Sequence, residues 1–191
     1  MDIVSGSEEQ EKQLQIILEK LVTLKSEEDS HVEYKTSALS SQSMKDNLVR
    51  TVTAFLNSKD GGCFIIGIAE NEKKEPVFLG LEKTEKKKDD EGRETGKVTF
   101  KNRDDYNQTI FHYIADNIDN GSDRINENIR LKWNTEYGVT ICALFIKPYV
   151  LGPNQIPAFA RIFEKTENYR KKEFKEVFYL RQSNYTKELN I

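Results

Sequence analysis

The stretch LVRTVTAFLNSKDGGCFIIGIA, residues 48–69, decides the fold of this chain. Its first half carries apolar residues at helical spacing, which predicts an amphipathic helix that ends at NSKDGG, where glycine supplies the conformations of a tight turn. These residues are Leu48, Val49, Val52, Phe55 and Leu56. The run CFIIGIA, residues 63–69, is continuous and apolar, so we expect one central strand buried on both faces.

Upstream of this stretch, a helix is predicted over residues 8–25. Its apolar side chains share one stripe, as in a helix that packs on a core. The stripe consists of Leu14, Ile17, Leu18, Leu21 and Val22.

Between this helix and the central stretch, HVEYKTS, residues 31–37, alternates in polarity. Val32 and Tyr34 fall on one face and Glu33 and Lys35 on the other, which is typical of a half-buried strand.

Downstream, the pattern predicts further strands and one helix. A charged loop is expected over 83–97 and a helix from about residue 104 to 118. Strands are expected around 77–79, 129–133, 139–146, 158–163 and 177–181. This order predicts an α+β fold: a mixed or antiparallel sheet packed with two or three helices, with an N-terminal helical segment, 1–26, and one domain, 27–191.

Charge and composition limit the possible functions. Lys and Arg number 29 against 32 Asp and Glu, for a net charge of −3. Bulk positive charge therefore cannot hold nucleic acid, and binding needs a local basic patch or metal ions on carboxylates. No run is long enough to span a membrane, and MDIVSGSEEQ does not resemble a signal peptide, so we expect a cytoplasmic protein without a membrane partner.

Acidic residues and a lysine gather around the first strand. Glu28, Glu33 and Lys35 lie there, and Glu70 follows the central strand. Carboxylates bind hard ions such as Mg²⁺ or Mn²⁺, which stabilise negative charge on phosphate, and a lysine neutralises charge or orients water. The residues alone leave two interpretations open, the metal site of a nuclease and a solvated strand edge whose acids are structural.

Several motifs, taken in order, resemble the Schlafen-type AlbA-like (divergent AlbA, Schlafen-core) domain family. They are EDSHVEYKTS, VTAFLNSKDGGCFIIGIAEN, LGLE and FYLRQSNYT, and the resemblance spans about residues 28–187. It implies an α+β fold that binds nucleic acid. In Schlafen members, it also implies three carboxylates that support metal-dependent cleavage of structured RNA such as tRNA.

Carried over to this chain, the resemblance implies that Glu28, Glu33 and Glu70 are catalytic and hold Mg²⁺ or Mn²⁺, and Lys35 is the fourth expected catalytic residue. Glu70 stands where the family more often has aspartate. The segment RQSNYT departs from the family pattern, because Ser183 and Asn184 replace glycine and serine.

The expected partner is nucleic acid, RNA in preference to DNA, bound through phosphates. The candidate binding residues are Lys35, Lys59, Arg181, Asn184, Thr186, Arg170, Lys171 and Lys172. Animal Schlafens carry two such lobes that form a cradle, so a chain with one lobe would need a homodimer to rebuild it.

Three functions therefore remain open. The first is a metal-dependent endoribonuclease, the second a non-catalytic DNA- or RNA-binding module, and the third a protein-interaction domain without either activity.

Overall fold

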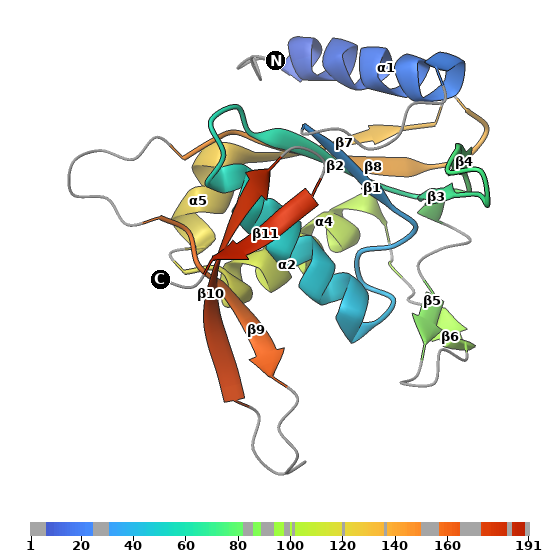
Figure 1. Ribbon diagram of the computed structural model, residues 1–191. Coiled ribbons are helices and arrows are strands. Elements are labelled where there is room, and N and C mark those ends of the chain that lie inside the picture. The colour runs from blue at the N-terminus through green and yellow to red at the C-terminus, as the bar shows by residue number, and fades with distance from the viewer. Residues whose placement is uncertain are drawn as a thin grey trace.

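The computed structural model describes residues 7–24, 31–81, 86–88, 94–97, 100, 102–119, 121–135, 137–149, 157–164, 173–182 and 185–189. A four-stranded sheet forms its centre, in the order β1 (Val32–Lys35), β2 (Gly62–Ile66), β8 (Ile141–Ile146) and β7 (Ile129–Asn134). Strand β1 is parallel to β2, whereas β2–β8 and β8–β7 are antiparallel. The sheet is therefore mixed, and the predicted α+β class is confirmed (Figure 1).

Helix α1 (Ser7–Leu24) covers one face of this sheet (Figure 1). Its buried leucines and Ile17 share a hydrophobic cluster with Val32 and Tyr34 of β1 and with residues of β2 and β8. The predicted stripe is confirmed apart from Val22, which is 45% exposed. The adjacent Leu21 is only 3% exposed, so Val22 lies on the solvent side of the stripe.

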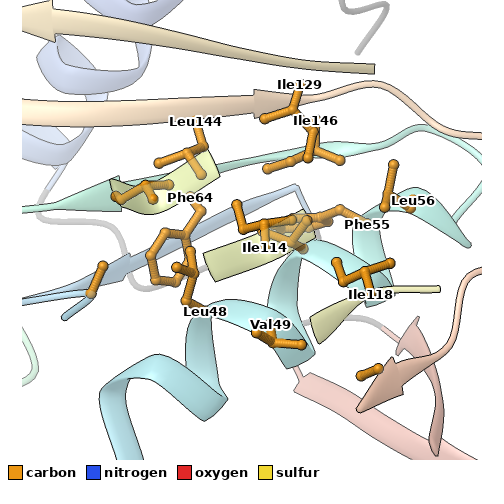
Figure 2. Close-up of a cluster of buried hydrophobic side chains, with 14 of the residues drawn as sticks. Leu48, Val49, Phe55, Leu56, Phe64, Ile114, Ile118, Ile129, Leu144 and Ile146 are labelled. Atoms are coloured by element: carbon orange, nitrogen blue, oxygen red, sulfur yellow. The ribbon is translucent and has the colours of Figure 1, made fainter. Parts of the chain in front are cut away.

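Helices α2 (Gln42–Leu56) and α4 (Arg103–Asn117) pack on the opposite face. Figure 2 shows Leu48, Val49, Phe55 and Leu56 of α2 in one layer with side chains of the central strands and of α4. A short helix, α5 (Gly121–Asn128), precedes β7 and was not predicted, because its sequence is polar. The structure thus describes four helices where two or three were expected.

A second, three-stranded antiparallel sheet packs on α2 from the other side (Figure 1). It consists of β9 (Ala160–Glu164), β10 (Glu173–Gln182) and β11 (Tyr185–Leu189), with β10 in the middle. Strand β10 is longer than the predicted 177–181, and β11 was not predicted. Helix α2 therefore lies between two sheets.

The apolar run 63–69 was predicted to be one strand, and this prediction is wrong. Gly67 has a φ of +105°, and the chain turns there out of the central sheet. The next residues form β3 (Ile68–Glu70), which pairs with β4 (Pro76–Phe78). Within the predicted charged loop, β5 (Lys86–Lys88) pairs with β6 (Glu94–Lys97), so that part of the loop is a hairpin.

The segment NSKDGG joins α2 to β2 through contacts that are structural. The Asn57 amide donates to the carbonyls of Ala158 and Tyr179 at 2.9 and 3.0 Å, and its oxygen accepts from the Ala158 amide at 2.9 Å. A side chain at Gly62 would overlap the Phe55 ring. This segment therefore ties α2 to both sheets.

Candidate nucleic-acid interface

Glu33 lies between two cations. Its Oε1 is 2.6 Å from Lys35 Nζ, and its Oε2 accepts a hydrogen bond of 2.7 Å from Arg181 Nη1. We call Glu33, Lys35 and Arg181 the ion cluster. Both carboxylate oxygens therefore already have a cationic partner.

Two strands far apart in sequence, β1 and β10, build the ion cluster, and helix α2 lies against it. Strand alternation turns Val32 and Tyr34 toward α1, so Glu33 and Lys35 face the α2 layer. Arg181 arrives from β10, 148 residues after Glu33. Its guanidinium lies over the Phe55 ring of α2, 5.3 Å from the centroid, a favourable cation–π geometry.

The structure differs here from the half-buried strand that the sequence predicts. The side chains of Glu33 and Arg181 are only 9% and 3% exposed, and they pair where β10 approaches β1. Lys35 is 26% exposed, and its Nζ also donates to the Tyr34 carbonyl at 3.0 Å. With two cations and one carboxylate, the ion cluster has a formal charge of +1, and Lys35 is its most exposed member.

Thr186, another predicted binding residue, adjoins the ion cluster. It is opposite Arg181 in the β10–β11 register, and its Oγ1 is 3.4 Å from Arg181 Nη1. Lys59 does not join them. It is exposed and precedes the start of β2, whereas Lys35 ends β1, so the two lysines lie at opposite ends of a parallel strand pair. Asn184 lies outside the described residues.

Glu70 does not join Glu33 either. Its Oε1 accepts a hydrogen bond of 3.2 Å from the Tyr34 hydroxyl, and Tyr34 projects from the opposite face of β1. The adjacent Asn71 closes the β3–β4 turn, since its Oδ1 accepts from the amides of Lys73 and Glu75 at 2.9 Å. Glu70 and Asn71 thus have structural contacts of their own.

The described residues do not fit a three-carboxylate metal site. No group of three His, Cys, Asp or Glu side chains among them is placed to hold a metal ion. Glu33 is already bound by two cations, and a metal ion there would be repelled by both. Glu28 lies outside the described residues, as do Arg170, Lys171 and Lys172, so the parts of the prediction that rest on them stay predictions.

Sequence reasoning missed two aromatic–cation pairs on α2. Lys45 Nζ is 5.3 Å from the centroid of the Tyr113 ring, and the Arg50 guanidinium is 5.8 Å from that of Tyr179. Burial raises the pKa of the Tyr113 hydroxyl, and the hydrogen bond that it accepts from Gln42 opposes the shift. These pairs join residues from different elements, so no local pattern reveals them.

With this geometry established, comparison with known proteins identifies the class. The family model described as "Schlafen, AlbA_2" matches residues 28–190, and the chain belongs to this family. The family associates the chain with a nucleic-acid-related function. Among curated proteins, no significant match exists.

One similar solved structure is that of the DIP2311 protein from Corynebacterium diphtheriae, with 11% sequence identity and a TM-score of 0.48. The alignment covers 94% of this chain but only 27% of that protein, so this chain spans about a quarter of its length. Among the helices that the structure describes, none combines the length and apolar character needed to cross a bilayer.

Proposed function

We propose that this chain is a nucleic-acid-binding module that contacts backbone phosphates through Lys35. The observation that supports this most directly is the ion cluster, which has a formal charge of +1 and exposes Lys35 more than its other two members. Glu33 and the Tyr34 carbonyl hold the ammonium in place, so little side-chain freedom remains to be lost on binding.

The partner is RNA in preference to DNA, and recognition is by shape and phosphates rather than by base sequence. A chain with a net charge of −3 cannot hold RNA by its overall charge, so binding is local and weakens as salt screens the contact. The proposal includes a homodimer that brings the Lys35 sites of two chains together. It also includes a cytoplasmic location.

A second candidate is a metal-dependent endoribonuclease that acts on structured RNA such as tRNA. The contact between Glu33 and Lys35 favours it, because an acid and a lysine at one strand end are components of such sites. This function requires Glu28 and Mg²⁺ or Mn²⁺. It ranks second because the described carboxylates do not converge.

The experiment measures binding of labelled tRNA, and of a DNA duplex of similar length, by fluorescence anisotropy in EDTA at low salt. We expect Lys35→Ala to weaken tRNA binding about tenfold. The matched control is Lys20→Ala, which removes an exposed lysine from α1, on the other face of the central sheet. Equal affinity of the wild type and Lys35→Ala would contradict the proposal.

Wild type and Glu33→Gln, each incubated with labelled tRNA in Mn²⁺ and resolved on a gel, test the second candidate. Cleavage that needs Mn²⁺ and disappears in Glu33→Gln would establish the nuclease. Light scattering with and without RNA determines the oligomeric state.

A further inference from the structure

We propose that Glu33 is a positioning residue, which holds the three-stranded sheet against the central sheet and orients Lys35, and is not a metal ligand. The importance of orienting Lys35 rests on the proposed function. The role of Glu33 in holding the two sheets together does not.

The position of Arg181 shows what Glu33 connects. Arg181 belongs to β10, the middle strand of the second sheet, and Glu33 to β1, an edge strand of the central sheet. Their hydrogen bond crosses beside Phe55, which packs in the layer between the sheets. Asn57, through its bond to the Tyr179 carbonyl, makes a second connection to β10. The ion cluster and the Asn57 contact are therefore both polar links to the second sheet.

Burial determines the strength of this link. An ion pair whose side chains are 9% and 3% exposed is poorly screened, and removing one partner leaves an uncompensated charge in the interior. The two partners are not equivalent. Loss of Glu33 removes the carboxylate that lies 2.7 Å from Arg181 Nη1, whereas loss of Arg181 leaves Glu33 still bound to Lys35.

A metal ligand would behave in the opposite way. Carboxylates gathered for a metal repel one another when the metal is absent, so neutralising one of them stabilises the metal-free protein or leaves it unchanged. Added metal would then stabilise the wild type by binding only the folded state.

Thermal unfolding of the full chain distinguishes the two roles. Wild type, Glu33→Gln, Arg181→Met and the double variant are each melted in EDTA and in Mn²⁺. We expect Glu33→Gln to lower Tm by about 10 °C in EDTA, Arg181→Met to lower it less, and Mn²⁺ to leave every Tm unchanged. Glu70→Gln is the matched control and should change Tm little, because Glu70 is exposed.

The double variant keeps the test decisive if Glu33→Gln alone does not fold. Because it removes the buried cation together with its carboxylate, it should be more stable than Glu33→Gln. A double variant no more stable than Glu33→Gln would overturn the proposal. So would a Glu33→Gln protein as stable as wild type in EDTA, or a rise of wild-type Tm in Mn²⁺ that Glu33→Gln abolishes.

Binding is measured separately on the same proteins. If the Tm pattern is as expected and no variant or wild type binds tRNA, the nucleic-acid function fails while the structural role of Glu33 stands. If wild type binds tRNA and the Tm pattern is absent, the structural role of Glu33 fails while the nucleic-acid function stands.

Discussion

At the scale of single residues, a few polar side chains determine how the layers meet. Asn57 lies at the end of α2. Its side-chain amide donates to the Tyr179 carbonyl of β10 and to the Ala158 carbonyl before β9, and its oxygen accepts from the Ala158 amide. Such an arrangement suits asparagine, because its planar amide carries two N–H donors beside a carbonyl acceptor. The Asn in AFLNSKDGG is thus explained by packing.

We expect Asn57→Ala to lower the free energy of unfolding by about 2–4 kcal/mol, since three hydrogen bonds of partly buried groups are lost. Urea denaturation measures this. The control is Asn71→Ala, whose bonds lie in an exposed turn and which should cost less. Equal costs for the two variants would contradict the role given to Asn57.

Tyr179 provides a prediction about pH. Burial raises the pKa of its hydroxyl above the ordinary 10.0; the Arg50 cation opposes this shift, and Glu188, to which the hydroxyl donates a hydrogen bond, adds to it. Above pH 10 the unfolded state therefore loses this proton before the folded state does, so stability falls as pH rises there and is unaffected at neutral pH.

The comparison is between wild type and Tyr179→Phe, which share all other titrating groups. We expect the stability advantage of wild type at pH 8 to shrink at pH 11, measured as the difference in Tm. A difference in Tm that is the same at pH 8 and pH 11 would show that Tyr179 does not contribute to the pH dependence of stability.

At the scale of elements, the break between β2 and β3 shapes the surroundings of the ion cluster. The Gly67 amide donates to the Lys35 carbonyl at 2.9 Å, and the Gly67 carbonyl accepts from the amides of Leu79 and Gly80 at 2.9 Å. Its φ of +105° is open to glycine and costly for other residues. One residue thus ends the parallel pairing of β1 with β2 and starts the β3–β4 hairpin that carries Glu70.

Gly67→Ala should lower the free energy of unfolding by about 2–3 kcal/mol, because the backbone becomes strained and the new methyl group crowds Ile141. Gly138→Ala is the control. Gly138 also has a positive φ, +72°, but nothing lies within 4 Å of the position of a side chain, so only the smaller backbone cost remains. The free energies of unfolding of the two variants are compared by urea denaturation. A loss of stability in Gly138→Ala as large as that in Gly67→Ala would contradict the predicted crowding against Ile141.

At the scale of the whole molecule, α1 belongs to the same core as the domain that the family model matches from residue 28. Leu18 is fully buried in the cluster between α1 and the central sheet. The proposed division at residues 26 and 27 stays a prediction, but the packing indicates one cooperative unit.

Leu18→Ala should lower the free energy of unfolding by about 2–5 kcal/mol. Unfolding is followed by the fluorescence of Trp133, the single tryptophan. Trp133 packs against the cluster that contains residues of α2 and α4, on the side of the central sheet opposite α1. Ile16→Ala is the control, because Ile16 is 45% exposed. An unchanged Trp133 transition in Leu18→Ala would show that α1 unfolds on its own.

The sequence by itself determined the fold class, the α1 stripe, α2, α4 and most strands of the central sheet, because each follows from a periodicity of apolar residues that depends only on neighbours in the chain. The order of the motifs also identified the family. Tertiary structure decided the rest. Whether Glu33 lies at a wet edge or in a buried ion cluster depends on Arg181, 148 residues away, and on the sheet that brings it there. Charge pairing and burial arise between distant segments, and neither leaves a periodic trace in the sequence.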